Sequence, residues 1–175
     1  MNRVLFVLIF FSSFLLNNAL FAGELHVGEG KRYKKIEDAI AAVKSGEIIR
    51  IFAGTYFSDK QIIRLINKKN VGIIGDGRVV LSSSTDKEIA LISGCDNVLI
   101  RNIIFQYKNN AKKSKSPVLV IERSSKINIG WCEFSGSGVS GVSISQGTTI
   151  RFTNNFVHNN KDFSISVISS LKILV

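Results

Sequence analysis

The sequence contains few of the residues from which common functional sites are built. Two Cys and two His are present among 175 residues, and their spacing fits no metal-ligand motif, so neither a metal nor a cofactor is expected. No complete glycine-rich fingerprint opens a helix and no nucleic-acid-binding motif occurs, so neither a nucleotide nor a nucleic acid is expected as a ligand. Acidic residues are also scarce, 13 against 23 Lys and Arg, which gives a net charge of +10.

The residues that are abundant favour a folded β-rich domain. Ile, Val, Ser and Asn are frequent, 14 Gly are present, and the length is that of one domain, which together argue against a disordered chain. The excess of basic residues suggests acidic partners such as polyuronates, sulfated glycans, lipopolysaccharide or anionic lipid. The alternative is that the lysines only keep the protein in solution.

Residues 1–22 have the three-part pattern of a secretory signal peptide. Arg3 precedes an almost wholly apolar run over 4–16, and small residues follow it. Two asparagines at 17–18 cut this run short of the about 20 apolar residues that a membrane span needs. We therefore expect cleavage after Ala22, no transmembrane segment in the mature chain, and a secreted, periplasmic or cell-surface location.

One helix is predicted, over residues 33–44, after a short strand at 25–27. Its apolar face recurs at helical spacing and is formed by Ile36, Ala39, Ile40 and Val43. Gly46 follows at a position where a left-handed residue is expected to end the helix. Everything beyond Gly46 predicts short strands separated by turns.

The strands repeat, and the repeat predicts a solenoid. An apolar–any–apolar motif starts 22, 27, 29 and 23 residues apart at Ile49, Val71, Val98, Ile127 and Ile150. A second motif recurs in step, 23 residues apart, at Val142 and Ile165. A period of this length with three short strands corresponds to one coil, and stacked coils bury their apolar sides in one core. The alternative β-sandwich would need frequent hairpin turns, and Asp76-Gly77 is the only dipeptide of that kind.

The ends and bends of such a stack need particular residues. The helix would cover the open edge of the first coil. Residues that tolerate a left-handed backbone are expected at the bend that follows positions 100, 129 and 152, namely Asn102, Gly130, Asn154 and Asn155. The strand pattern at 171–175 has no cap after it, which predicts a truncated product or a chain that pairs with another chain.

The two cysteines are predicted to remain unpaired. Cys132 lies 5 residues after the motif start at Ile127, whereas Cys95 lies 3 residues before the start at Val98. They therefore occupy different corners of the coil, too far apart for the Cα separation of at most about 7 Å that a disulfide requires. The Cys132 side chain is expected to point into the core.

Four segments resemble the pectin lyase-like superfamily of right-handed parallel β-helix proteins. YKKIEDAIAAVKSGEIIRIFAGTY is similar to the amino-terminal cap and first coil of that superfamily. Three later segments resemble successive coils of that superfamily, namely NVGIIGDG, NVLIRNIIF and GVSISQGTTIRFTNNFV. The resemblance covers residues 25 to about 170 and implies an all-β right-handed parallel β-helix over 23–175, capped by a helix at 33–44. The superfamily includes lyases, hydrolases, esterases, epimerases, tailspikes and adhesins, so the resemblance is specific for fold and not for function.

The resemblance also implies where a substrate would lie. In this superfamily it usually follows one sheet, which here would contain residues 118–121, 142–144 and 165–167, beside the loops 106–117 and 158–162. The candidate substrate-binding residues on and around these segments are Lys108, Lys112, Lys113, Lys115, Arg123, His158 and Lys161. A cationic wall beside an exposed groove would attract a polyuronate. The alternative is a solvated insertion without a role.

The enzyme signatures of the superfamily are incomplete in this chain. Acids near the expected groove are limited to Glu122, Glu133 and Asp162, with no repeated pair for a hydrolase and no cluster for calcium. Pro117 is the only proline, so the Asp-Pro-His-Glu signature of mannuronan epimerases is absent. No catalytic residue is assigned. The sequence favours a surface module that binds acidic polysaccharide or another anionic surface; the alternative is a polysaccharide lyase, epimerase or hydrolase relative.

Overall fold

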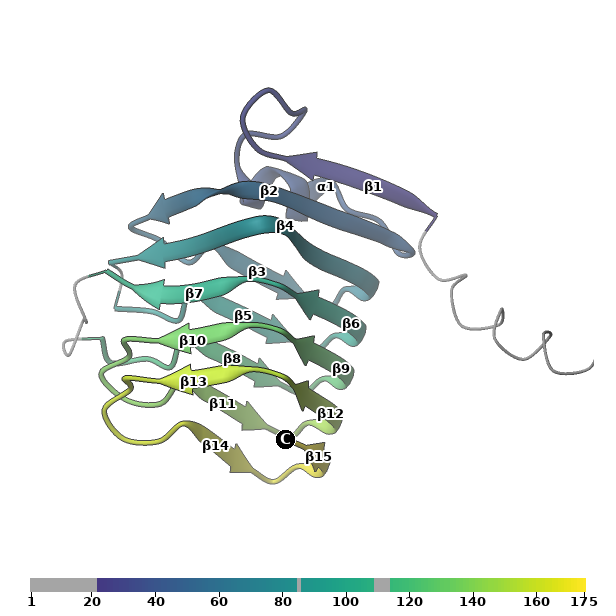
Figure 1. The fold of residues 1–175 in the computed structure, drawn as a ribbon. Coiled ribbons are helices and arrows are strands. Elements are labelled where there is room, and N and C mark those ends of the chain that lie inside the picture. Colours follow the sequence, from purple (N-terminus) through teal and green to yellow (C-terminus); the bar gives the residue numbers. More distant parts are fainter. Residues whose placement is uncertain (1–21, 85, 109–113) are drawn as a thin grey trace, which may run out of the picture.

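The fold is a right-handed parallel β-helix: a solenoid, as the repeat predicts, of the type that the resemblance implies. The computed structural model describes residues 22–84, 86–108 and 114–175. In Figure 1 the coils descend from top to bottom, the front strands run to the left and the strands behind them run to the right, which makes the winding right-handed. Among the described residues, one short helix and fifteen strands are present.

The elements follow one another in a regular order. The first coils contain β1 (Gly23–Val27), α1 (Ile36–Ala42), β2 (Glu47–Ser58), β3 (Ile63–Ile66), β4 (Lys69–Ser83) and β5 (Ala90–Ser93). The middle coils contain β6 (Asp96–Arg101), β7 (Ile104–Tyr107), β8 (Leu119–Glu122), β9 (Ser125–Gly130) and β10 (Glu133–Ser135). The last coils contain β11 (Val142–Ser145), β12 (Thr148–Thr153), β13 (Phe156–His158), β14 (Ile165–Ile168) and β15 (Leu171–Leu174).

The strands form two parallel sheets around one core. Ten strands make a bent sheet with two limbs: β6, β9, β12 and β15 lie on the first limb, and β7, β10 and β13 on the second. The long strand β4 pairs with both limbs and, through β2, continues to β1. A five-stranded sheet, β3-β5-β8-β11-β14, lies behind the bent sheet in Figure 1. Each coil therefore has three corners, numbered here in chain order from the end of the five-stranded sheet.

The register confirms three of the four predicted motif spacings and corrects the first. Val71 pairs with Val98, Val98 with Ile127, and Ile127 with Ile150. Ile49, however, pairs with Ile73, so it does not align with Val71. A shift by two residues keeps every side chain on the same side of the sheet, so the apolar pattern alone could not detect it.

The core is a stack of inward-facing apolar side chains in which one position recurs coil after coil. Ile73, Ile100 and Ile129 are fully buried one above another, and Phe152 follows at the same position. On the second limb the rings of Phe105 and Phe134 stack with their centroids 5.0 Å apart. Such stacking removes apolar area from water between coils, which is the main term that holds a solenoid together.

The capping helix is present but shorter than predicted. It spans Ile36–Ala42 instead of 33–44, and it buries Ile36, Ala39 and Ile40 against the first coil. Tyr33 is not helical, because its backbone N–H donates to the His26 carbonyl and its own carbonyl accepts from Gly28 N–H. Gly46 has φ 85° as predicted, but Val43 has already left the helix in an extended conformation.

Left-handed residues mark the corners, and the prediction for the second corner is half right. At this corner Asn102 and Asn154 have φ of 57° and 55°. In the coil between them the left-handed residue is Trp131, with φ 56°, and not Gly130, which ends strand β9. Asn155 is not left-handed either; its side chain instead donates to the Ile129 carbonyl and accepts from the Cys132 N–H.

The first corner shows the same conformation in every described coil. Its left-handed residues are Asn67, Gly94, Arg123, Gln146 and Ser169, with a second set three residues later at Asn70, Asn97, Lys126, Thr149 and Lys172. A left-handed backbone costs about 1–2 kcal/mol for residues with a side chain, less for Asn. The fold imposes this geometry on basic residues as well as on asparagines.

The cysteines are unpaired and buried, as predicted. Cys95 lies just after the first corner and Cys132 just after the second. The Cys132 Sγ points into the core and lies 3.3 Å from the Gly130 carbonyl oxygen. Burial raises the pKa of the Cys132 thiol to about 12.

Two sequence predictions concern the ends of the chain: a signal peptide at residues 1–22 and a strand pattern at 171–175 with no cap after it. Residues 1–21, which carry nearly all of the predicted signal peptide, lie outside the described residues. Within the described ranges, no helix has the length and apolar character needed to cross a membrane. Apolar side chains are exposed on the last two strands and at the residue that follows them, namely Val167, Ile168, Leu171, Leu174 and Val175.

Replacing Ile129 with Asp should abolish the folded state. The substitution places an unpaired carboxylate in the stacked core, where Ile129 is fully buried, and costs several kcal/mol out of the about 5–15 kcal/mol typical of a domain. The mutant should lose the cooperative thermal transition that circular dichroism detects in the parent protein. Thr153→Asp adds the same charge on an exposed position of the next coil and should unfold near the parent temperature. Equal melting of the two variants would contradict the assigned core.

The two thiols should be hidden until the protein unfolds. Burial raises the pKa of both, so the reactive thiolate is scarce at neutral pH and lies out of reach of a reagent. A disulfide-exchange reagent added to unreduced protein at pH 8 should react slowly in the native state. The same reagent should titrate two groups per chain in denaturant, and a count of zero would show a disulfide and contradict the register between 95 and 132.

Candidate functional site

The outer face of the five-stranded sheet presents two columns of side chains to solvent. Alternation along each strand sends Ile63, Ala90, Leu119 and Val142 inward, where they are fully buried. The outward positions form a first column of Arg64, Leu91, Val120, Ser143 and Ser166 and a second of Ile66, Ser93, Glu122, Ser145 and Ile168. This face is the one on which the sequence analysis expects a substrate, and its three predicted strands do lie side by side.

Basic side chains stand at both ends of these strands. A strand of four residues is about 13 Å long, so the sheet is a narrow strip between two corners. At the first corner, Arg123 and Lys126 are exposed; at the third corner, Lys115 and Lys161 are exposed on the loops that lead into β8 and β14. Lys112 and Lys113, two further predicted binding residues, lie outside the described residues.

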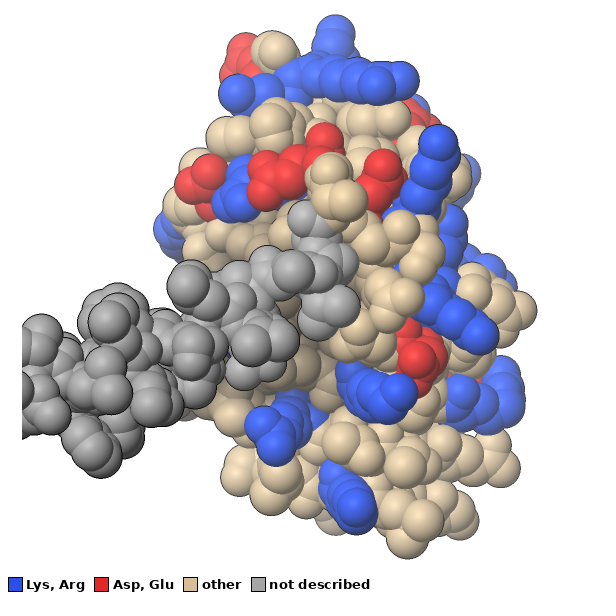
Figure 2. Space-filling model, turned by 90° about the vertical axis from the view of Figure 1, so that its right-hand side faces the viewer, with Lys and Arg blue, Asp and Glu red and all other residues tan. Residues whose placement is uncertain are grey.

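The first corner forms a basic edge along the stack. Figure 2 looks onto this side of the molecule, and Lys and Arg side chains line the upper and middle parts of its right-hand edge, with a smaller number of acidic side chains beside them. Every second coil contributes cations to this corner, namely Lys68 and Lys69, then Arg123 and Lys126, then Lys172; the described segments 94–97 and 146–149 between them carry no Lys or Arg. The edge adjoins the five-stranded sheet, so it borders the strip described above.

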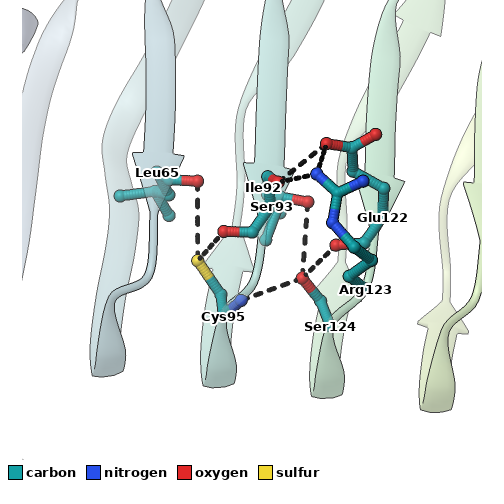
Figure 3. A network of polar contacts seen from close by, with 7 residues as sticks. All are labelled: Leu65, Ile92, Ser93, Cys95, Glu122, Arg123 and Ser124. Atoms are coloured by element: carbon teal, nitrogen blue, oxygen red, sulfur yellow. Dashed lines mark hydrogen bonds and ion pairs between the residues drawn. The ribbon is translucent and has the colours of Figure 1, made fainter.

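Arg123 is held in place by a polar network, drawn in Figure 3. Its Nη2 donates to Ser93 Oγ at 3.0 Å and forms an ion pair with Glu122. Ser93 Oγ in turn donates to Glu122 Oε1 at 2.7 Å. The only acid of the two outer columns is therefore compensated, while the Arg123 side chain remains 60% exposed.

A second part of the network fixes the corner beneath Arg123. Ser124 Oγ accepts the Cys95 N–H at 3.0 Å and lies 2.8 Å from the Glu122 carbonyl, to which it donates. The Cys95 thiol lies 3.4 Å from the Ser93 carbonyl, and burial raises its pKa. These bonds satisfy backbone groups at the bend and hold the left-handed conformation of Arg123, whose φ is 47°.

Lys126 is partly compensated by a neighbouring acid. Its Nζ lies 3.6 Å from Asp96 Oδ1, and Ser125 Oγ donates to the same oxygen at 2.6 Å. The hydrogen bond from Ser125, with a smaller contribution from the Lys126 charge, lowers the pKa of Asp96. The ion pair is exposed and therefore weak, so Lys126 can exchange Asp96 for an external anion.

His158 lies apart from the other predicted binding residues. It projects from β13 on the bent sheet, its Nε2 is 3.1 Å from Glu133 Oε1, and the Phe156 ring stacks on it at 4.1 Å. Lys108 also points elsewhere, since its Nζ lies 5.0 Å over the Phe57 ring near the capping helix. The structure thus brings Arg123, Lys115 and Lys161 to the two ends of the five-stranded sheet and leaves His158 and Lys108 outside it.

Glu122 and Glu133 do not share a site, and the described residues assemble no metal site. Glu122 is on the five-stranded sheet and Glu133 on the bent sheet, so these two carboxylates do not face a common substrate. No group of three or more His, Cys, Asp or Glu side chains is positioned to hold a metal ion in the described part of the chain. The cations at both ends of the five-stranded sheet support binding of an anion.

Charge-based sequence analysis missed one surface feature. Trp131 and Phe156 are 64% and 62% exposed and line a groove at the second corner. A signal was present in the sequence, because Trp131 occupies a repeat position that is Asn in the coils on either side. Without the register of this corner, that signal could not be recognised.

Comparison with known proteins supports the fold alone. No protein-family model and no curated protein matches the chain. A crystal structure of a pectin methylesterase mutant in complex with a hexasaccharide is similar, with a TM-score of 0.54 and 17% identity over 74% of this chain and 53% of that one. A candidate glycosyl hydrolase from Parabacteroides merdae has a TM-score of 0.55 and 13% identity, over 75% of this chain and 73% of the other. The chain spans about half the length of the pectin methylesterase, and these likenesses support its parallel β-helix fold.

Proposed function

We propose that the protein binds an acidic polysaccharide along the outer face of the five-stranded sheet. The observation that carries the proposal is the distribution of charge: exposed cations border the strip at both corners, and its one acid, Glu122, is neutralised by Arg123. An extended polyanion laid along the stack would meet basic side chains in every second coil of the first corner, and Lys115 and Lys161 at the third corner. Secretion through the segment 1–22 would place the protein where such polymers occur, and this location is part of the proposal.

The similar structures are compatible with this proposal. The pectin methylesterase was crystallised with a hexasaccharide, and the second similar protein is described as a candidate glycosyl hydrolase. A binding role fits this chain better than catalysis, because Glu122 and Glu133 lie on different sheets and no metal cluster is present among the described residues. Lyase activity would instead be detected as unsaturated uronate, by ultraviolet absorbance, after incubation with pectate or alginate.

Removal of the third-corner cations should weaken binding of polygalacturonate. The variant Lys115→Ser/Lys161→Ser lacks two exposed charges, each worth up to about 1 kcal/mol to an ionic contact, so the affinity should fall about tenfold at 0.1 M salt. At 1 M salt the Debye length shortens from about 10 Å to about 3 Å, and the two proteins should bind almost equally. Calorimetric titration at both salt concentrations measures the difference.

A matched control separates a local site from the overall charge. Lys34→Ser/Lys35→Ser removes the same charge from exposed positions beside the capping helix. Both double variants should keep the parent stability within about 0.5 kcal/mol, because exposed substitutions rarely cost more. If the control loses as much affinity as the third-corner variant, net charge alone explains binding and the proposed face is wrong.

A further inference from the structure

The second corner carries a groove that the proposed function does not use. It lies on the outer side of the bent sheet between its two limbs, at the front of Figure 1, whereas the five-stranded sheet lies at the back. Its volume is about 640 Å³, and its lining includes Arg78, Trp131, Glu133, Asn154 and Phe156. With Asn102, which also lines it, the groove draws on four successive coils, so it runs along the stack.

Trp131 has a backbone conformation that its side chain disfavours. Its φ is 56°, and the residues at the same corner of the flanking coils, Asn102 and Asn154, have φ of 57° and 55°. Asn adopts this conformation readily, whereas a bulky aromatic residue there is a rare exception. The indole is 64% exposed and adds little to the core, so packing does not explain its presence. A strained residue that the core does not need indicates a role at the surface.

Phe156 supplies a second exposed ring in the same groove. Its side chain is 62% exposed. The ring of His158, two residues later on the same strand, stacks on the Phe156 ring with 4.1 Å between the ring centroids. His158 in turn contacts Glu133 at 3.1 Å, which fixes the orientation of the stacked pair. The groove therefore offers aromatic faces held by a neighbouring strand, together with a carboxylate that can accept hydrogen bonds.

Two guanidinium groups stand beside these aromatic rings. Arg78 lines the groove. Arg101 lies beside Gly130 on the neighbouring strand, and a Cβ added to Gly130 would lie 3.8 Å from the Arg101 Nε. Gly130 thus leaves room for Arg101 next to Trp131. Neither arginine forms an ion pair in the described part of the structure, so both can bind an external anion.

We propose that this groove binds a sugar ring that carries an anionic group, either a carboxylate or a sulfate. The apolar C–H face of a pyranose ring packs on the flat face of Trp131, as aromatic surfaces favour a ligand with one apolar and one polar side. A guanidinium donates two parallel hydrogen bonds to a carboxylate or sulfate, which suits Arg78 or Arg101. Sugar hydroxyls can donate to Glu133. This site is separate from the basic face of the five-stranded sheet.

The single tryptophan makes the test direct. Trp131 is the only Trp in the chain, so tryptophan fluorescence reports on this groove alone. The full chain is titrated with a galacturonate hexasaccharide, a sulfated galactan hexasaccharide and a neutral galactan hexasaccharide. A saturable emission shift is expected with an anionic probe, at least tenfold tighter than with the neutral one, and the tighter anionic probe identifies the group. No shift with any probe, or equal affinity for the neutral sugar, overturns the proposal.

Substitutions separate binding from folding. Trp131→Asn introduces the residue used in the flanking coils, so it should melt at or above the parent temperature. Placed in the Lys115→Ser/Lys161→Ser background, where binding at the other face is weakened, it should show by calorimetry at least a tenfold loss of affinity for the anionic probe relative to that background. Arg78→Gln/Arg101→Gln should remove the preference for the anionic sugar and keep weak stacking. Phe163→Ser, which removes an exposed ring outside the groove, should bind as the parent does. Unchanged affinity in Trp131→Asn overturns the proposal.

The two proposals fail independently. Lys115→Ser/Lys161→Ser leaves the groove intact, so the fluorescence titration should be unchanged even though binding at the other face weakens. Loss of the emission shift in that variant would contradict a separate site at the second corner. Loss of affinity only in Trp131→Asn, with the lysine variant unaffected, would support the groove and count against the five-stranded sheet as the binding face.

Discussion

The structure depends on one constraint: each coil must return to the position from which the previous coil began. Parallel hydrogen bonds join equivalent residues of neighbouring coils, so Val71, Val98, Ile127 and Ile150 form one column, and any drift would break the whole ladder. The fixed path explains the left-handed residues at the first and second corners. The spacing changes where residues are added between paired segments, as in the loop between β7 and β8 and at the second corner within β4, between Ile74 and Val80.

The inward-facing residues of the coils could be predicted from the sequence. Alternate apolar residues and a recurrent spacing identify coils, and the buried positions of Ile100, Ile129 and Phe152 follow directly. A shift of two residues between β2 and β4 preserved the same alternation and could not be seen. The predicted start of the helix failed because Tyr33 extends the pairing of β1, a tertiary interaction that helical periodicity does not encode.

The placement of the exposed side chains could be predicted only in part. Charge identified the lysines, but a sequence cannot show that Lys108 turns toward Phe57 or that His158 faces a different sheet from Arg123. The apolar repeat does not restrict which residues occur at exposed positions. Where these side chains meet therefore depends on the register of the corners and loops. The groove at Trp131 illustrates this, because its residues are scattered over four coils and meet only when the chain is wound.

The corners have a consequence for how such a protein can change over evolution. A left-handed residue there, such as Arg123, Lys126, Trp131 or Lys172, directs its exposed side chain away from the core. The backbone cost is similar for the basic residues, and Trp131 shows that the ladder accepts an even less favourable side chain, so exchange at a corner leaves the ladder of coils undisturbed. A corner column is thus a row of interchangeable positions at the spacing of one coil, about 4.8 Å. New surface chemistry can be acquired there one residue at a time, with no compensating change inside the stack.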